Sequence, residues 1–374
     1  MTLVGDGQSQ IWPRAPHPTP YTEQWSFDLQ YQLSSRSVFQ IGYMGNRGRK
    51  LLYGNPNINA DQLPGQYLAL GPQLDQQIPN PFLGVLDPST PLGSQETIPY
   101  NQLLRPFPEF TYLSWTRSLP GARSSYNALD MKFNHRFGAD LSVLVTYRWS
   151  KALDNGPEDF IGWGTGNQWR DSYNTMLDYN ISTHDVPQSF ATALVYDLPY
   201  GRGKRWGGSA PAVVKEIAGN WQVSSVIRLA SGLPLPTGVF WSYSNPLGPY
   251  GFPGPELANL VGNPVPSHRT PNSWVNPDAY AEPAPFTLGN APQRMTQLRE
   301  RAARNFDISV AKNFGGERFQ AWFRAEFLNA FNYAQYSLSP FNSFPLCVSC
   351  GDFGDLDSTE NSPRNIQLSL KLVF

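Results

Sequence analysis

The sequence predicts an all-β protein, namely part of an antiparallel transmembrane β-barrel with about nine strands, long external loops and short periplasmic turns. Short segments repeat the two-residue alternation of apolar and polar side chains that is typical of strands. Charged residues make up only 15% of the 374 residues, whereas soluble domains average about 25%. Connections between the segments alternate between short and long, so that the long ones all fall on one side of the predicted sheet.

The composition excludes several other classes. The mean hydropathy is -0.40, and no run of about 18 apolar residues is present that could form a transmembrane helix. A barrel is the other structure that spans a bilayer with its backbone polar groups paired. Aromatic residues at 14% suit barrel girdles, while 35 prolines and 32 glycines indicate long irregular loops. The net charge of -1 gives no electrostatic reason to expect nucleic-acid binding.

Nine segments carry the strand pattern, and the last of them is the clearest. Ile366, Leu368 and Leu370 fall on one parity, whereas Gln367 and Ser369 fall on the other. An uncharged oily parity suits a strand that faces lipid, with its polar parity turned toward a wet lumen. The predicted strands cover residues 22–33, 38–45, 126–137, 141–150, 190–198, 221–229, 306–311, 319–327 and 364–374.

The connections differ in length according to the end of the sheet on which they fall. Short turns are predicted at residues 34–36, 138–140, 199–219 and 315–317, and long loops at 46–124, 151–187, 232–304 and 333–363. Within the third turn, the apolar piece 212–217 is a candidate for one helical turn. Transmembrane barrels sort their connections in this way, and a soluble sandwich has no reason to do so.

The strand count bears on the domain organisation. Single-chain bacterial barrels have an even number of strands, and an open sheet leaves two unpaired edges in lipid. We therefore expect the C-terminal part of a larger barrel, with residues 1–21 as a lead-in and residues 22–374 as the barrel portion. Residues 1–20 lack the basic start and apolar core of a signal peptide, so we expect that signal to lie upstream.

Cys347 and Cys350 form a C-x-x-C pair in the last long loop. A redox motif requires a thioredoxin-like βαβ context, and a zinc site requires two further ligands; the sequence shows neither. A disulfide that closes this turn is therefore favoured over two unlinked thiols. Asp352, Asp355 and Asp357 follow closely, but they lack the spacing of a known calcium loop, so a solvated acidic turn is favoured there.

Loop aromatics are the candidates for contact with a ligand, namely Trp163, Trp169, Trp241 and Tyr243. Their rings suit stacking on a sugar or holding a peptide, and they suit equally well the packing of the loops over a barrel mouth. No catalytic, cofactor-binding or metal site is predicted. His184 and Asp185 beside Ser189 lack an oxyanion site and a nucleophile elbow, so loop hydrogen bonding is favoured for them.

Short motifs follow one another in a fixed order along the chain. They are residues 19–21, 23–25, 43–48 (YMGNRG), 57–59 (NIN), 125–129 (SYNAL), 147–154 (YRWSKALD), 185–187 (DVP), 198–201 (LPYG), 326–332 (EFLNAFN), 353–354 (FG) and 362–367 (SPRNIQ). This ordered succession resembles TonB-dependent outer-membrane receptors, most closely the Oar-like group.

The resemblance implies a barrel of about 22 strands with a plugged lumen, placed in the bacterial cell outer membrane and energised by TonB from the inner membrane. The plug domain, TonB box and signal peptide of such receptors have no counterpart in the sequence, so coupling is expected through a missing plug. Phe374, the terminal aromatic, resembles the signal that is read by the outer-membrane assembly machinery.

The expected function is uptake of an unidentified substrate that the long external loops select, with no enzymatic activity and no cofactor. The expected partners are outer-membrane lipid, the assembly machinery, the TonB system and an extracellular ligand, and nucleic acid is not among them. The alternative is a non-transporting surface or adhesion protein that displays the same loops. A soluble glycan-binding β-sandwich is a third hypothesis, which the sorted loops and the low charge content disfavour.

Overall fold

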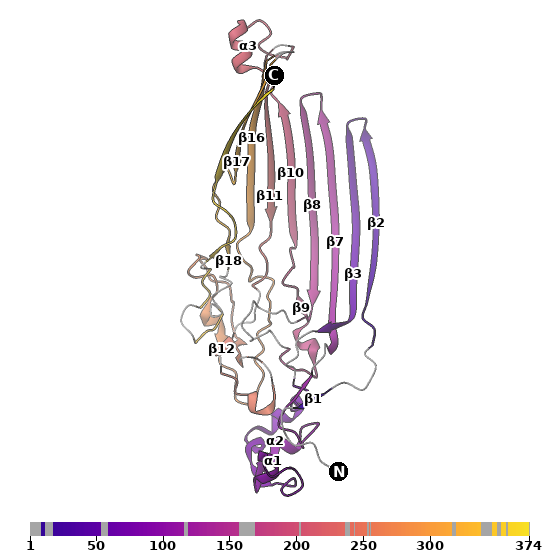
Figure 1. Ribbon diagram of the computed structural model, residues 1–374, viewed down its shortest axis with the longest axis vertical. Helices are drawn as coiled ribbons and strands as arrows, with labels where there is room; N and C mark the ends of the chain where they lie inside the picture. The colour runs from indigo at the N-terminus through magenta and orange to yellow at the C-terminus, as the bar shows by residue number, and fades with distance from the viewer. Residues whose placement is uncertain are drawn as a thin grey trace.

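One large antiparallel sheet dominates the computed structural model (Figure 1). The structure describes residues 9–11, 18–53, 59–115, 119–156, 169–201, 203–235, 240–242, 244–252, 254, 256–315, 319–337, 346–349, 353–356 and 358–373. In spatial order the sheet contains β2 (Tyr21–Ser34), β3 (Ser37–Tyr53), β7 (Leu119–Phe137), β8 (Leu141–Asp154), β10 (Gln188–Asp197), β11 (Trp221–Ala230), β16 (Ala303–Gly315), β17 (Gln320–Leu328) and β20 (Asn365–Val373). The nine predicted strands and the all-β class are confirmed.

Two strands are longer than the alternation predicts. β3 and β7 extend toward the long loops and pair there with each other, with register shifts between Gly48 and Leu51 and between Leu51 and Leu52. A bulge of this kind breaks the two-residue period while the ladder of backbone hydrogen bonds continues. The alternation therefore marks where side chains have two distinct faces, and the ladder reaches beyond it.

The register places the apolar parity of every long strand on one face of the sheet. Phe27 lies opposite Tyr43, and Phe323 lies opposite Leu370, at the two ends of the strand order. On the other face Asp130 lies opposite Arg148, whose guanidinium donates to it over 2.6 Å. We call these the outward face and the lumen face, as the barrel class requires.

The connections are sorted as predicted (Figure 1). The end with short turns carries α3 (Ala212–Ala218), so the predicted helical turn is confirmed. At the turn after β7, Gly138 has a φ of 65°, a conformation that glycine adopts without steric cost.

The other end carries the long connections with their short elements. The first connection contains η1 (Gly65–Asp75), β4 (Gln77–Pro79), α1 (Pro91–Ser94), β5 (Thr97–Pro99), α2 (Tyr100–Leu103) and β6 (Leu113–Trp115), which pairs with β1 (Ser9–Ile11). The second contains η2 (Thr175–Asp178) and β9 (Asn180–Ile181), which pairs with the end of β8. The third contains β12 (Phe240–Ser242), η3 (Gly248–Tyr250), β13 (Glu256–Leu257), β14 (Asn259–Leu260), η4 (Pro277–Ala279) and β15 (Tyr280–Ala281), and the fourth contains β18 (Tyr336–Ser337) and β19 (Ser358–Thr359).

Burial in the described residues is the reverse of that in a soluble β protein. The hydrophobic clusters lie in the long connections, where Leu63 and Leu74 pack with Leu247 and Tyr250. On the sheet, large apolar side chains are exposed, with Phe27 at 70% and Leu368 at 71%. A sheet whose oily face is uncovered while its loops have a core suits a lipid environment around the strands.

The edges of the sheet are β2 and β20, which do not pair with each other in this structure. All eight neighbouring pairs are antiparallel, so these two edge strands run in the same direction. Among the described residues, no helix has the length and apolar character needed to cross a membrane.

Candidate functional site

The four long connections pack into one external loop body, a name that we use for their described residues (Figure 1). Arg170 links the second connection to the third. Its guanidinium donates to Asp178 over 2.7 Å, to the Gly289 carbonyl over 3.0 Å and to the Ala291 carbonyl over 3.3 Å. These bonds neutralise the guanidinium charge and engage three of its five N–H groups within the protein.

Two arginines of the third connection also join it to the second connection and to the end of β8. Arg294, in the third connection, donates to the Asp154 carboxylate at the end of β8 over 2.9 Å and to the Ile181 carbonyl. Arg299 donates to both the carboxylate and the carbonyl of Asp185. Because each pair is shielded from water and has several hydrogen bonds, removal of one partner would leave an uncompensated buried charge.

The first connection joins the second through a buried amide. The Gln62 side chain donates to Asp171 over 2.7 Å and accepts from the Ser172 backbone over 3.0 Å. Tyr173 donates through its hydroxyl to the Ala60 carbonyl over 2.7 Å. These contacts join residues more than a hundred positions apart, so the loop body is a folded unit with its own polar network.

Asp61 is a buried carboxylate in this network, with a relative exposure of 0%. It accepts a hydrogen bond from the Phe107 backbone over 2.8 Å, and its second oxygen lies 3.8 Å from the Arg105 guanidinium, beyond hydrogen-bonding distance. Burial raises the pKa of the Asp61 carboxyl from its ordinary value to about 7, more than Arg105 and the Phe107 amide lower it. This carboxyl therefore titrates near neutral pH.

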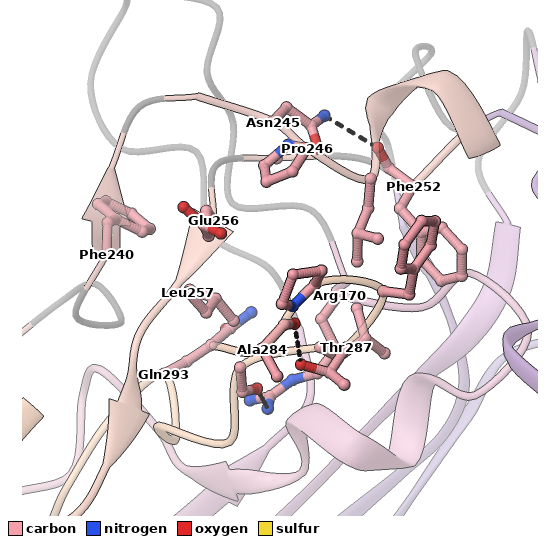
Figure 2. Close-up of a pocket in the computed structure, with 16 residues that line it drawn as sticks. Arg170, Phe240, Asn245, Pro246, Phe252, Glu256, Leu257, Ala284, Thr287 and Gln293 are labelled. Carbon is pink, nitrogen blue, oxygen red and sulfur yellow. Dashed lines mark hydrogen bonds between the residues drawn. The ribbon is translucent and has the colours of Figure 1, made fainter. Parts of the chain in front are cut away.

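A pocket opens in the loop body between the β12–β13 region and residues 284–293 (Figure 2). Its empty volume is about 730 Å³, a figure that includes the open solvent at its mouth. Most of its described lining is apolar, namely Phe240, Pro246, Leu247, Phe252, Leu257, Ala284, Pro285, Phe286 and Leu288. We call it the loop pocket.

The polar groups of the loop pocket are mostly satisfied by the protein. Asn245 donates from its amide to the Phe252 carbonyl over 3.0 Å, and the Thr287 hydroxyl donates to the Ala284 carbonyl over 2.5 Å (Figure 2). Arg170 is engaged as described above. The Glu256 carboxylate also lines the pocket, where burial and, secondarily, the charge of Glu282 raise its pKa. The pocket is thus an apolar cavity with an anionic group in its wall.

The aromatic candidates occupy different positions. Trp169 is 2% exposed, and its indole donates to the Asn155 carbonyl over 2.5 Å, so the structure places it in the packing of the loops. Trp241 lies in β12 and is partly buried against a cluster that includes Leu346. Trp163 and Tyr243 lie outside the described residues.

The cysteine segment adds to the edge of β12. The Phe240 amide donates to the Leu346 carbonyl over 2.9 Å, and the Val348 amide donates to the Phe240 carbonyl over 2.8 Å. Cys347 is fully buried and disulfide-bonded, with its sulfur 3.8 Å from the Trp241 carbonyl oxygen. Cys350, the other of the two cysteines of the chain, lies outside the described residues, so the predicted pairing stays a prediction.

Three further residues singled out in the sequence are not described by the structure. Asp352, Asp357 and Phe374 lie outside the described part of the chain. Within that part, no group of three or more His, Cys, Asp and Glu side chains is placed to hold a metal ion.

Comparison with known proteins was made on both sequence and structure. The outer membrane transporter YddB from Escherichia coli is similar with a TM-score of 0.43 and 7% identity, over 98% of this chain and 34% of that one. The FrpB iron transporter from Neisseria meningitidis gives a TM-score of 0.40 and 9% identity, over 95% of this chain and 31% of that one. The chain thus spans about a third of the length of these proteins. No curated protein matches the chain.

A family model described as an outer membrane beta barrel domain matches residues 3–367. This match covers nearly the whole chain, including eight of the nine strands of the large sheet and the first residues of β20. It agrees with the uncovered outward face, the polar lumen face and the sorted connections. The protein is therefore located in the bacterial outer membrane, and the chain belongs to the outer membrane β-barrel domain family.

Proposed function

We propose that the chain forms the C-terminal part of the barrel of a TonB-dependent outer-membrane receptor of the Oar-like group, which takes up a substrate captured by its external loops. The observation that carries this proposal is the folded external loop body, whose apolar pocket lies at one end of a sheet with a polar lumen face. The ordered motifs and the family membership support the same proposal.

The lumen face offers a polar route beneath the loops. An open hollow lies over this face and is lined by Asp28, Gln40, Asp130, Lys132 and Arg148 among others; its empty volume of about 1600 Å³ includes open solvent. Charged and amide side chains of both signs suit the wall of a wet passage. We assign the chain a role in binding and transport rather than in catalysis.

We infer a substrate class from the lining of the loop pocket. Its walls are aromatic and aliphatic, so the body of the ligand must be apolar. The Arg170 guanidinium is already paired with Asp178, whereas Glu256 lines the cavity and Glu282 lies close enough to raise its pKa. We therefore propose a ligand that combines an apolar body with one cationic group, as in a short hydrophobic peptide with a free amino terminus.

TonB coupling is a proposal about the whole protein. It requires a plug domain and a TonB box in the assembled receptor, which we propose as the partners of this barrel together with the outer-membrane assembly machinery. Phe374 remains the proposed assembly signal. Outer-membrane lipid covers the outward face.

The proposal can be tested by uptake in cells that produce the full gene product. A radiolabelled hydrophobic tripeptide amide with a free amino terminus should accumulate only when TonB is intact. Glu256→Gln should reduce uptake about tenfold, because one charge-assisted contact is lost. Glu96→Gln, at an exposed acid of the first connection, should have no effect.

Binding to cells without TonB-dependent accumulation would contradict transport and favour a display protein. A different outcome would contradict only the proposed substrate class. In it, accumulation depends on TonB but does not change in Glu256→Gln and is equal for the N-acetylated peptide. The receptor proposal would then still stand.

A further inference from the structure

The turn between β10 and β11, residues 198–220, is long for the end of the sheet on which it lies. The other described turns there have only a few residues. Figure 1 shows that α3, within this turn, lies beyond the ends of the strands. The turn is therefore an element with a structure of its own, and we call it the helical turn.

The apolar side of α3 is uncovered. Val213 is 68% exposed, Val214 is 41% exposed and Ile217 is 65% exposed. These positions are one, three and four residues apart, which places them together on one side of a helix, while Lys215 falls on the opposite side. No residue of α3 is buried by the rest of the described chain.

The end of α3 is held by two side chains of the sheet. The Trp221 indole donates to the Ile217 carbonyl over 3.0 Å. The Lys312 ammonium donates to the same carbonyl over 2.9 Å and to the Gly219 carbonyl over 2.5 Å. A cation that hydrogen-bonds the last carbonyls of a helix is a favourable cap.

Both of these side chains belong to the outward face. Trp221 lies opposite Lys312, and Lys312 lies opposite Phe323, on the parity that continues through Leu370 of β20. The chain that follows α3 is therefore tied to the outward face, and the lumen face takes no part in this contact. In the membrane, the outward face meets lipid.

The residues around this contact resemble the aromatic belt that lies at the membrane–water interface of a barrel. The Lys312 ammonium lies 4.8 Å from the Phe314 ring centroid and 5.3 Å from that of Trp221. Trp221 in turn meets Phe323 edge to face at 6.2 Å. Tryptophan and lysine at the end of transmembrane strands are typical of the headgroup region.

The part of the helical turn that precedes α3 carries basic and amphipathic side chains. Lys204 is paired with Asp140 of the neighbouring turn over 2.7 Å, which fixes the position of the loop. The Arg205 guanidinium lies over the Trp206 ring at 5.5 Å, and that ring is 55% exposed. Arginine and tryptophan at this level suit anionic phosphates and the acyl boundary.

We propose that the helical turn is a membrane anchor that inserts Val213, Val214 and Ile217 into the periplasmic leaflet of the outer membrane. A helix of seven residues is not stable in water alone, and the described part of the chain buries none of its apolar residues. The phospholipid of the inner leaflet is the occupant that its position, its aliphatic side and its basic flank fit together. The anchor acts beside the barrel wall and does not depend on the proposed transport function.

The test uses the full gene product in vesicles of phosphatidylethanolamine and phosphatidylglycerol. An environment-sensitive fluorophore is attached in Ile217→Cys, and in Lys215→Cys as the control on the opposite side of the same helix. Nitroxide groups on the acyl chains should quench the dye at position 217 at least about threefold more than at 215, as insertion of one helix side requires. The unsubstituted chain, treated identically, measures labelling of Cys347 and Cys350.

Equal quenching of the two positions by acyl-chain nitroxides, with equal access for aqueous iodide, would overturn the proposal. A dye at position 217 that is shielded from both quenchers would also overturn it, because a second protein chain and not lipid would then cover α3. As a second variant, Val213→Asp combined with Ile217→Cys should raise iodide access to position 217, since a charge on the inserted side weakens insertion.

Discussion

Asp61 shows how a single buried residue can make the loop body sensitive to pH. The folded state favours the protonated carboxyl, since its pKa is about 7 against 3.8 in an open chain. The folded state therefore binds more protons than the unfolded state between these values, and stability falls as pH rises from about 4 to about 7. We expect the loop body to melt at a lower temperature at pH 8 than at pH 5.

Asp61→Asn should remove this dependence while it keeps the bond from the Phe107 amide. The midpoint of loop-body unfolding, followed by limited proteolysis, should then change less between pH 5 and pH 8 than in the unsubstituted chain. Asp87→Asn, at an acid of the same connection that titrates below its ordinary pKa, serves as the control. An unchanged pH dependence in Asp61→Asn would contradict this assignment.

Arg294 makes a second residue-level prediction, about the link between loops. Its side chain is fully buried and meets Asp154 and the Ile181 carbonyl. Arg294→Ala leaves Asp154 without its partner, and loss of one member of a buried pair typically costs about 3–5 kcal/mol. Hydrogen exchange of the amides in residues 178–187 should accelerate accordingly.

Arg123→Ala is the matched control, because that side chain is exposed in the same region. It should leave the exchange of residues 178–187 unchanged. If the amides of residues 178–187 exchange at the same rate in both variants, the arginine links do not hold the loop body together.

At the scale of elements, the strands could be predicted from the sequence and the loop contacts could not. A strand with one face in lipid repeats its pattern every two residues, so β20 and β17 are visible in the sequence alone. The helical piece at 212–217 was visible as an apolar run without prolines.

The loop pocket has no such periodic signal. Leu63 bonds to the Tyr250 carbonyl and packs with residues of the third connection, almost two hundred positions away. Glu256 and Phe286 meet in one cavity only because the connections fold over each other. Trp169 and Trp241 were found from residue type, but type alone does not separate a buried packing residue from one at a surface.

The two faces of β20 give an element-scale prediction. Leu370 is 62% exposed near the middle of the strand, on the parity assigned to lipid. Leu370→Arg should cost about 2–4 kcal/mol of barrel stability, since the charge is placed in the hydrocarbon region. Urea unfolding in lipid vesicles measures this cost.

Gln367→Arg is the control on the lumen face of the same strand. It lies opposite Glu326, so the new cation gains a partner of opposite charge. Its effect should be within about 1 kcal/mol. Equal destabilisation by the two variants would contradict the assignment of the outward and lumen faces.

The whole molecule combines an oily sheet surface with a loop body that has its own core. The two parts depend on different solvents, because the sheet needs lipid on its outward face while the loop body buries Leu63 and Leu346 among protein atoms. One sequence pattern therefore accounts for both the membrane placement and the fold of the loops. In this pattern, strands with alternating apolar and polar side chains are followed at every second connection by an irregular, proline-rich segment.

The edges of the sheet lead to a prediction about closure. β2 and β20 run in the same direction, so direct pairing of two copies would create parallel contacts at both seams. An odd number of further strands closes the ring with antiparallel contacts throughout and an even total, as in single-chain bacterial barrels. We therefore expect the two edges to be paired with such strands and not with a second copy of this chain.

Cysteine cross-linking in membranes checks this expectation on the full gene product. Leu29→Cys combined with Ile41→Cys should form an intramolecular disulfide, because the two positions are direct partners across β2 and β3. Leu29→Cys combined with Leu368→Cys should give no covalent dimer. A dimer of the second variant at the yield of the first would show that copies of the chain close the barrel together. In that case the lumen would be shared between two loop bodies, and each pocket would serve half of one larger pore.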